Sequence, residues 1–483
     1  MRKLENIQPE RVFWHFEELC RIPHGSGNTA AISEHIAAFA EEHGLRYVRD
    51  EMNNCIIWKN ASSGYENASP VILQGHMDMV CEKRPDVEHD FLKDGLNISV
   101  ENGYVTANGT TLGGDDGIAV AYMLALLEDP DIPHPPLECV FTVDEEIGLL
   151  GAAGLDTSVL SGKRMINLDS EAEGILWIAC AGGSCLKSCL PVHRIEQEGV
   201  LLQIDLDGLM GGHSGGEIDK IRMNADHMMA RYLYELSEKT EFGLLSLSGG
   251  LKDNAIPRSC TCRICVSADD VQIAEETAQQ LQQDLRTEYA GTDPNASVRV
   301  TRLEEGKYEV LHPTSREKVI FFLRNLPFGV QKMSGSISGL VETSLNLGIL
   351  NLEEDRLYAE NSVRSSVGSA KKDLQRQIIY LTEFLGGECT VTGDYPAWEY
   401  REDSPLREKM AEVYREKYHE EPKILAIHAG LECGLFYDRI EGLDCVSIGP
   451  DMTDIHTSEE HLGIASTERV WNYLLEVLKE LKD

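Results

Sequence analysis

The stretch of sequence that decides the fold is Val71-Ile72-Leu73-Gln74-Gly75-His76-Met77-Asp78. Its apolar first half is typical of a buried β-strand, and its second half carries an imidazole and a carboxylate where the strand meets a loop. In an open α/β sheet, ligands bind at the edge formed by the carboxyl ends of the strands. The stretch therefore predicts one strand of such a sheet, with functional side chains at its end.

Three further stretches place acidic residues at the end of a strand or in a glycine turn: Leu112-Gly113-Gly114-Asp115-Asp116-Gly117, Val140-Phe141-Thr142-Val143-Asp144-Glu145-Glu146, and Met165-Ile166-Asn167-Leu168-Asp169. A single acid at a strand end is often only solvated, or caps the following helix. Four such stretches in order within one alternating segment instead favour a shared site. Imidazole and carboxylates that converge on one edge are typical of a divalent-metal site.

The order of the elements divides the chain into two parts. Strands and helices alternate at both ends, which predicts the α/β class with a helix-covered, mainly parallel sheet. The middle differs, because strands there are followed by a glycine-rich turn and by long helices. We expect residues 1–186 and 395–483 to form one α/β catalytic domain, and residues 187–394 to form an inserted α+β domain, called the lid here.

Two similar motifs within the lid suggest an internal repeat. Asn254-Ala255-Ile256-Pro257-Arg258-Ser259 and Asn361-Ser362-Val363-Arg364-Ser365-Ser366 each precede a predicted helix. Repeated motifs are the mark of a duplicated architecture, although two short matches leave an unduplicated lid open. The cysteines at 260, 262 and 265 lie in a stretch whose alternation predicts a strand rather than a structural zinc site.

Composition limits the partners of the protein. The 483 residues carry a formal net charge of −37, which argues against nucleic acid and anionic membranes. The sequence contains no run of about 18 apolar residues, so it predicts no membrane span. The first residues, Met1-Arg2-Lys3-Leu4-Glu5-Asn6, lack the apolar core of a signal peptide. We therefore expect a cytoplasmic protein whose thirteen cysteines are reduced.

The motifs, taken together, resemble those of the M20 metallopeptidase family. That family has His-x-Asp, a glycine-rich Asp, Glu-Glu, a further Asp or Glu, and a late His followed by Ser/Thr-x-x-Glu. This sequence has each of them, the last as His456-Thr457-Ser458-Glu459. Gly211-Gly212-His213-Ser214-Gly215-Gly216 and His428-Ala429-Gly430-Leu431-Glu432-Cys433-Gly434 look most similar to the aminoacyl-histidine dipeptidase branch. The resemblance covers essentially the whole chain and implies a zinc-peptidase-like catalytic domain.

The resemblance implies a metal centre with two zinc ions, for which Co²⁺ or Mn²⁺ would substitute. Its ligands would be His76, Asp115 as the bridging carboxylate, Glu146, Asp169 and His456. Asp78 would orient His76, Glu145 would be the general base, and a cis peptide bond would join Asp115 to Asp116. His461 remains an alternative for the last ligand, although the spacing to the family's trailing Glu favours His456.

The resemblance also implies residues that contact the substrate. His213, between glycine pairs, would donate to the developing oxyanion. Asn254 and Arg364 would hold the backbone and the carboxylate of the substrate, since a guanidinium matches a carboxylate. Gly430 and Glu432 lie at another strand-to-helix turn, where Glu432 would bind a free amine. The alternatives are that His213 is a loop histidine and Arg364 a surface arginine, each without a role in the site.

The sequence thus predicts a two-zinc hydrolase that cleaves small dipeptides, most of all Xaa-His dipeptides of the carnosine type, by activated water with a glutamate base. A tripeptidase or an N-acyl amino acid deacylase of the same fold is the nearest alternative. A non-catalytic metal-binding protein would not need Asp78 and Glu145, and a dinuclear phosphoesterase would need a basic phosphate cradle. The sequence leaves open whether the protein forms a homodimer and whether the lid acts on the site of its own chain or on that of a partner.

Overall fold

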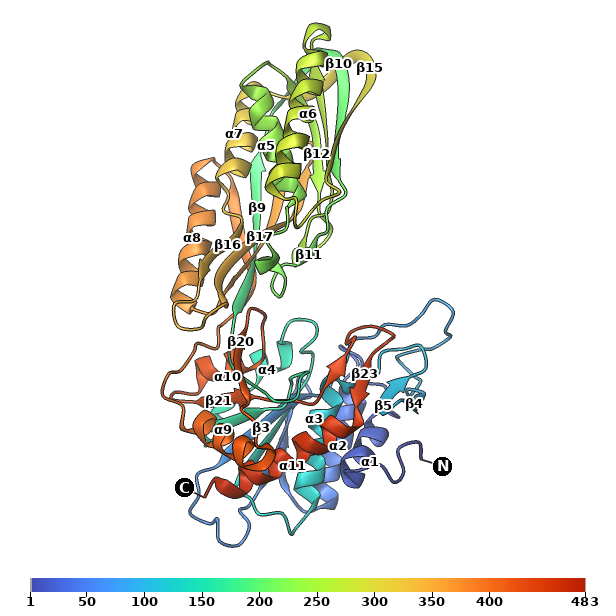
Figure 1. Cartoon of the computed structure of the whole chain (residues 1–483), viewed down its shortest axis with the longest axis vertical. Coiled ribbons are helices and arrows are strands. Elements are labelled where there is room, and N and C mark those ends of the chain that lie inside the picture. The colour runs from blue at the N-terminus through green and yellow to red at the C-terminus, as the bar shows by residue number, and fades with distance from the viewer. Residues whose placement is uncertain (1, 483) are drawn as a thin grey trace. The chain divides into compact units, whose positions relative to one another are not determined.

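The computed structural model describes residues 2–482 and has two compact units (Figure 1). The first unit comprises Met1–Cys180, Tyr400–Ala426 and Leu431–Asp483, and the second comprises Ala181–Glu399 and Ile427–Gly430. Both units combine sheets with helices, so the predicted α/β class is confirmed. No helix among residues 2–482 is both long and apolar enough to cross a membrane.

An eight-stranded sheet forms the centre of the first unit. Its order is β1 (Arg46–Arg49), β2 (Cys55–Lys59), β6 (Leu137–Thr142), β3 (Val71–His76), β7 (Arg164–Asn167), β21 (Asp444–Ser447), β8 (Ile175–Cys180) and β20 (Lys423–Ile427). Strands β6, β3, β7 and β21 pair in parallel, whereas β1–β2, β2–β6 and β21–β8 pair antiparallel. The parallel part of the predicted sheet is therefore its centre, and the pairings of β1, β2 and β8 outside that centre include antiparallel ones.

The apolar runs of the sequence explain this centre. Every residue of β3 and of β6 is buried, as expected for parallel strands that are covered on both faces. Helix α3 packs on β3 and is buried along almost its whole length. The helices of the unit are α1 (Glu10–Leu19), α2 (Ala30–Glu42), α3 (Gly114–Glu128), α4 (Leu150–Gly154), α9 (Pro405–Tyr418), α10 (Cys433–Arg439) and α11 (Ile464–Glu480).

A small four-stranded sheet joins the two ends of the chain in the first unit. Its order is β22 (Met452–Thr453), β23 (His461–Gly463), β5 (Tyr104–Ala107) and β4 (Ile98–Glu101). Strand β23 pairs with β5, just before the turn that begins α3. This pairing brings the loop that carries His456 back to the N-terminal segment.

The second unit contains a nine-stranded sheet, with helices α5 (Ala225–Ser237), α6 (Val271–Glu288), α7 (Pro313–Asn325) and α8 (Gly368–Phe384) side by side on one face (Figure 1). The order is β15 (Ser297–Leu311), β10 (Arg194–Asp207), β14 (Cys260–Val266), β12 (Gly243–Gly249), β17 (Val341–Leu352), β18 (Arg356–Ser365), β9 (Gly182–Pro191) and β19 (Glu388–Tyr395), with β16 (Gly329–Met333) paired to β17. The strand predicted around Cys260 and Cys262 is confirmed as β14.

The topology of this sheet repeats. One half runs β10, α5, β12, β14, α6, β15, and the other runs β9, α7, β17, β18, α8, β19. In both halves the strands lie in the order fourth, first, third, second, and the two second strands meet where Ser248 pairs with Asn351 and Gly249 with Leu350. The motif that starts at Asn254 leads into one third strand, and the motif that starts at Asn361 lies in the other. The repeated topology supports our proposal that the lid is duplicated.

The borders between the units differ from the predicted ones. The chain enters the second unit at Ala181 rather than at residue 187, because β9 begins at Gly182 and belongs entirely to the nine-stranded sheet. It leaves at Glu399, after β19 has ended. Residues Ile427–Gly430 also belong to the second unit, since the backbone N–H of Ala181 donates to the carbonyl oxygens of Ile427 and Ala429. Short excursions of this kind have no signal in the sequence pattern.

Two titratable side chains lie buried at the start of α5. Burial raises the pKa of Asp226, whose polar neighbour is the Cys260 thiol, to about 8. Burial and the charge of Arg324 lower the pKa of His227 to about 3. The folded protein therefore keeps both groups neutral around neutral pH. Unfolding releases a proton from Asp226 above pH 4 and takes one up at His227 below about pH 6.5.

We expect Asp226→Asn to change the pH dependence of stability above pH 6.5, where His227 no longer contributes. The contribution of Asp226 is present at low pH and falls as pH rises toward 8, at about 1.4 kcal/mol per pH unit. In the native protein, the free energy of unfolding measured with urea should fall by about 2 kcal/mol between pH 6.5 and 8, and Asp226→Asn should remove this fall. The exposed Asp219 provides the control Asp219→Asn. Equal slopes in the native protein and in Asp226→Asn would contradict this assignment.

Candidate metal centre

The start of α3 packs tightly against the end of β3. A Cβ atom at Gly75 would lie 2.5 Å from Asp116 Oδ2 and 2.6 Å from Ala119 Cβ, so the strand has room only for glycine there. The next residue, His76, donates its backbone N–H to Asp116 Oδ2 at 3.1 Å. This close approach places the first turn of the helix beside the imidazole of His76.

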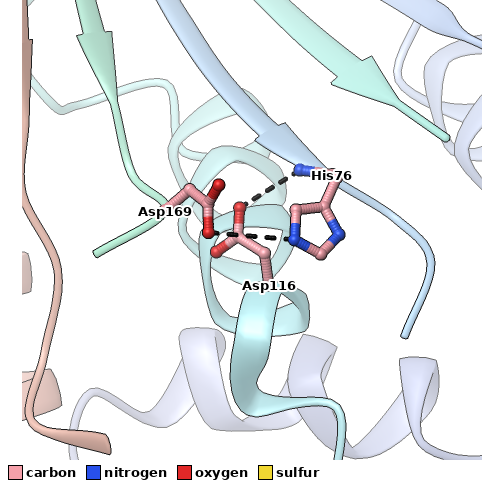
Figure 2. Close-up of side chains that lie close together, drawn as sticks. All are labelled: His76, Asp116 and Asp169. Carbon is pink, nitrogen blue, oxygen red and sulfur yellow. Dashed lines mark hydrogen bonds and ion pairs between the residues drawn. The ribbon is translucent and has the colours of Figure 1, made fainter. Parts of the chain in front are cut away.

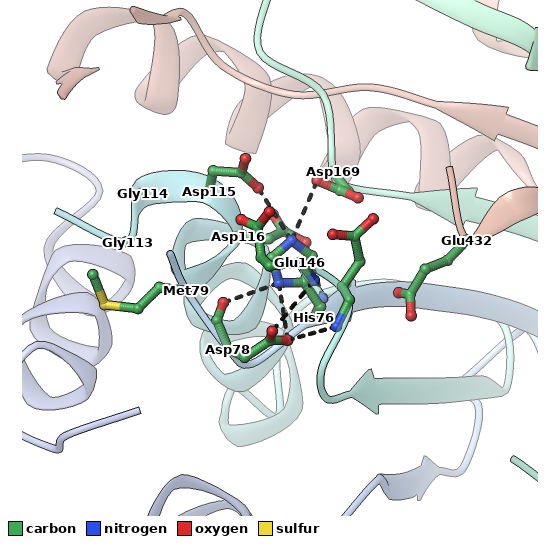
Figure 3. A network of polar contacts seen from close by, with 12 residues as sticks. His76, Asp78, Met79, Gly113, Gly114, Asp115, Asp116, Glu146, Asp169 and Glu432 are labelled. Carbon is green, nitrogen blue, oxygen red and sulfur yellow. Dashed lines mark hydrogen bonds and ion pairs between the residues drawn. The ribbon is translucent and has the colours of Figure 1, made fainter. Parts of the chain in front are cut away.

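The carboxylate of Asp115 lies between two imidazoles, of which Figure 3 labels that of His76. His76 Nε2 is 3.1 Å from Asp115 Oδ1, and His456 Nε2 is 3.1 Å from Asp115 Oδ2. His456 Nε2 also lies 3.0 Å from Glu146 Oε1, and these contacts with Asp115 and Glu146 raise the pKa of His456 to about 11. The peptide bond between Asp115 and Asp116 is cis. One carboxylate that faces two histidines is the arrangement that a bridging ligand requires.

Asp169 and Asp116 also lie beside His76 (Figure 2). Asp169 follows the end of β7, and its Oδ1 is 3.8 Å from His76 Nε2. Asp116 is completely buried, and its Oδ1 has no hydrogen-bond partner among residues 2–482. The sequence had marked Asp116 only as the neighbour of Asp115, and the structure adds it to the cluster.

Asp78 connects the histidine to the Glu145-Glu146 turn. Its Oδ1 lies 3.5 Å from His76 Nδ1 and accepts the backbone N–H of Glu145 at 3.1 Å. Its Oδ2 accepts the hydroxyl of Ser26 at 2.8 Å and the backbone N–H of Glu146 at 3.4 Å. Only 1% of Asp78 is exposed, so this carboxylate is not a solvated strand end.

His461 lies apart from the cluster. It begins β23, pairs with Thr106 of β5, and its ring meets the ring of Tyr104 edge-on, with 5.9 Å between the centroids. His456, by contrast, contacts both Asp115 and Glu146. The geometry therefore favours His456 over His461 as the last ligand.

Among the residues predicted to contact the substrate, His213, Asn254, Arg364 and Gly430 lie in the second unit. Strand β11 (Gly212–His213) pairs with β13 (Ala255–Ile256), directly after the exposed Asn254. A Cβ atom at Gly215 would lie 3.0 Å from His213 Cε1 and 3.1 Å from Arg364 Nε. The side chains of His213 and Arg364 therefore both lie close to Gly215.

Tyr395 extends this cluster, although the sequence did not single it out. Arg364 Nη1 donates to the Tyr395 hydroxyl at 3.1 Å, and a Cβ atom at Gly430 would lie 2.8 Å from the Tyr395 ring. Arg364 Nε is buried and has no hydrogen-bond partner within residues 2–482. One N–H of the guanidinium is thus left available.

Glu432 belongs to the first unit, unlike Gly430. Its side chain is completely buried, and its Oε2 accepts from Gln74 Nε2 at 2.5 Å and from the Thr142 hydroxyl at 2.6 Å. Burial raises the pKa of Glu432 to about 7. Its Oε1 is buried without a hydrogen-bond partner in the described part of the chain.

The cluster suits a divalent cation. Three overlapping groups each bring ligand atoms within 4.8 Å of one another: His76 with Asp116 and Asp169, His76 with Glu145 and Glu146, and Asp115 with Glu146 and His456. Burial, reinforced by neighbouring carboxylates, raises the pKa values of Asp116, Glu145 and Asp169 well above their ordinary range. Buried carboxylates without enough positive charge are costly, and a cation would supply that charge.

Comparisons with known proteins identify the class of protein as a peptidase. Residues 72–480 match the peptidase family M20/M25/M40. The chain is 36% identical over 486 residues to the cytosol non-specific dipeptidase of Escherichia coli (strain K12), covering 100% of this chain and 99% of the relative. The crystal structure of aminoacylhistidine dipeptidase from Vibrio alginolyticus matches with a TM-score of 0.91 at 33% identity, over 99% and 97% of the two chains.

A more distant structure, aminopeptidase PepT from Bacillus cereus ATCC 10987, shares the fold, with a TM-score of 0.57 at 16% identity over 99% of this chain and 100% of that one. The family match and the full-length relative lead to one conclusion. The chain belongs to the M20/M25/M40 peptidase family, and the resemblance seen in its motifs is confirmed.

We expect His456→Ala to weaken Zn²⁺ binding at least about tenfold, because it removes an imidazole that faces both Asp115 and Glu146. His461→Ala is the matched control and should bind Zn²⁺ like the native protein. Competition with a chromophoric chelator measures both affinities on metal-stripped protein. If His461→Ala lost the metal while His456→Ala kept it, the last ligand would have to be reassigned.

Proposed function

We propose that the protein is a two-zinc dipeptidase that hydrolyses small dipeptides, Xaa-His dipeptides among them. The observation that carries the proposal is the Asp115 carboxylate between His76 and His456, with the Glu145-Glu146 turn beside it. The two relatives named above, a non-specific dipeptidase and an aminoacylhistidine dipeptidase, support this substrate class. The name of the first relative also supports a cytosolic location.

The donor set supports zinc, which accepts both imidazole and carboxylate ligands. His76, Asp115 and Asp169 would hold one ion, and Asp115, Glu146 and His456 would hold the other. When bound, such a pair of ions lowers the pKa of a water molecule and polarises the carbonyl of the substrate. Asp78, whose backbone carbonyl oxygen lies 3.0 Å and whose Oδ1 lies 3.5 Å from Nδ1 of His76, would keep the proton on that nitrogen and leave Nε2 as the ligand atom.

Glu145 is the proposed general base. Its neighbour Glu146 faces His456, while the backbone of both residues is anchored on Asp78. Burial raises the pKa of Glu145 well above its ordinary value. The charges of Glu432 and Glu146 raise this pKa further, whereas the charge of His76 lowers it. A carboxylate of raised pKa takes a proton more readily, as a base that accepts it from water and returns it to the leaving amine must do.

His213 is the proposed donor to the carbonyl oxygen of the substrate. Its Nδ1 accepts the backbone N–H groups of Gly215 at 3.3 Å and Gly216 at 3.0 Å. Burial and the charge of Arg364 lower the pKa of His213, which favours the neutral ring. A neutral imidazole whose Nδ1 accepts carries its proton on Nε2. The loop thus holds His213 as an N–H donor, which is the form that stabilises an oxyanion.

Arg364 and Asn254 are proposed to bind the carboxylate and the backbone of the dipeptide. The unpartnered Nε of Arg364, close to His213 and Gly215, supports a role in binding an anion. Gly430 would keep Tyr395 close to Arg364. Glu432, with its unpartnered Oε1, would accept the free amine. Binding of this kind at both groups would favour a substrate with a free carboxylate and a free amine.

A substrate panel tests the proposal. Purified protein, metal-stripped and then supplied with Zn²⁺, Co²⁺ or Mn²⁺, is assayed by amine release from Ala-His, β-alanyl-histidine, other dipeptides, a tripeptide and N-acetyl amino acids. We expect metal-dependent cleavage of the dipeptides, with the blocked and longer compounds cleaved far more slowly. Preferred cleavage of the tripeptide or of the N-acetyl compounds would replace the dipeptidase by one of those alternatives.

Glu145→Gln should keep the metal and lose turnover. The amide preserves the shape of the side chain but accepts no proton, so kcat should fall at least about 100-fold. Glu146→Gln, the neighbouring and isosteric change, should instead weaken Zn²⁺ binding, because Glu146 faces His456. Metal analysis and steady-state kinetics of the two variants separate these roles. Loss of metal as the main defect of Glu145→Gln would make Glu145 a ligand.

His213→Ala should lower kcat and kcat/KM together, by about 100-fold or more, since an oxyanion donor acts in the transition state. His193→Ala, at an exposed histidine of the same unit, is the control. We further expect an equal mixture of His213→Ala and Glu145→Gln proteins to stay inactive, because a duplicated lid carries within one chain the half that a partner would provide. Recovered activity, with subunit exchange verified, would instead point to a site shared between two chains.

A further inference from the structure

Glu460 is a buried carboxylate that the proposed chemistry does not use. It lies between the loop of His456 and the start of β23, and only 2% of it is exposed. Its Oε2 accepts the backbone N–H groups of Leu112 at 2.7 Å and Gly113 at 3.1 Å. Its Oε1 accepts those of Gly114 at 2.8 Å and Asp115 at 3.4 Å. Four consecutive backbone donors therefore converge on one side chain.

These donors belong to the irregular turn that leads into the regular part of α3, because the backbone angles of Asp115 and Asp116 are not helical. Gly113 has a positive φ of 67°, which turns the chain so that the successive N–H groups point to one side. A carboxylate at such a position is favoured because hydrogen bonds from N–H groups to a charged acceptor are strong. Glu460 provides the acceptor for all four N–H groups.

The contact has little freedom to shift. A Cβ atom at Gly114 would lie 3.2 Å from Glu460 Oε1 and 3.3 Å from Met452 Sδ, so the turn is held closely against the carboxylate. The turn carries Asp115, and the loop that carries Glu460 also carries His456. Glu460 thus joins the backbone of one proposed metal ligand to the loop of another.

The preceding glutamate has a different environment. The Glu459 side chain is 62% exposed, and its nearest ion-pair partner, Arg84 Nη1, is 3.8 Å from its Oε1. Glu460, which has the Thr457-x-x-Glu spacing, therefore reaches the centre, whereas Glu459 does not. Because Glu459 and Glu460 are adjacent and have the same side chain, the same substitution at each residue tests the effect of position alone.

We propose that Glu460 is a positioning residue that fixes Asp115 between His76 and His456 before any metal binds and thereby sets the metal affinity of the site. The inference rests on the proposed metal centre. It requires no contact between Glu460 and the substrate. A glutamine at this position would turn one acceptor oxygen into an N–H donor that faces two backbone N–H groups, so the turn would lose two hydrogen bonds and shift.

The test compares Glu460→Gln with Glu459→Gln on metal-stripped protein, without substrate. We expect Glu460→Gln to raise the Kd for Zn²⁺, measured by competition with a chromophoric chelator, at least about tenfold and to change the visible absorption spectrum of the Co²⁺-loaded protein. Glu459→Gln should match the native protein in both measurements. With Zn²⁺ at saturation, Glu460→Gln should lower kcat for a dipeptide while KM changes less than about twofold.

A lower Tm of Glu460→Gln with unchanged Zn²⁺ affinity and Co²⁺ spectrum would overturn the proposal, since a purely structural role predicts that result. If Glu460→Gln does not fold, Glu460→Asp, which keeps the charge with a shorter reach, is measured against the same threshold, and an unchanged Kd overturns the proposal equally. The titrations use no peptide. Failure of the native protein to cleave dipeptides would therefore count against the proposed function and leave this inference standing.

Discussion

The proposed metal centre depends on the position of the Asp115 carboxylate between two imidazoles. His76 comes from the N-terminal part of the chain and His456 from the C-terminal part, and each lies 3.1 Å from one oxygen of this carboxylate. The two parts meet because β21 pairs in parallel with β7 and β23 pairs with β5. Without these long-range pairings, the ligands from the two parts of the chain could not share a carboxylate.

This arrangement concentrates acidic groups in a buried place, and the surrounding structure offsets their repulsion. Asp78 and Glu460 do so through backbone N–H groups, since each accepts more than one of them. Asp116, Glu145 and Asp169 have no comparable set of donors, and burial raises their pKa values well above the ordinary range. Burial also raises the pKa of Glu460, but the hydrogen bonds from Leu112, Gly113 and Gly114 act against that rise. The buried acids therefore divide into those that organise the backbone and those whose charge calls for a cation, as expected for a centre that is held in shape before it binds metal.

The second unit prepares its side chains by similar means. The loop of His213 uses two glycine N–H groups to orient one imidazole, and Tyr395 orients Arg364. Asp293 accepts the N–H groups of Met210 and Met223 at 2.7 and 2.8 Å, so both ends of this loop are held by one buried carboxylate.

The sequence by itself determined the α/β class, the strand ends that carry acids, and the family. These follow from local patterns, since apolar runs and the acids that end them are read along the chain. Only the tertiary structure decided that His456 rather than His461 faces Asp115, that Asp116 and Glu460 belong to the centre, and that Gly430 and Glu432 lie in different units. Those outcomes depend on strand register and on hydrogen bonds between residues far apart in the chain, which no local pattern encodes.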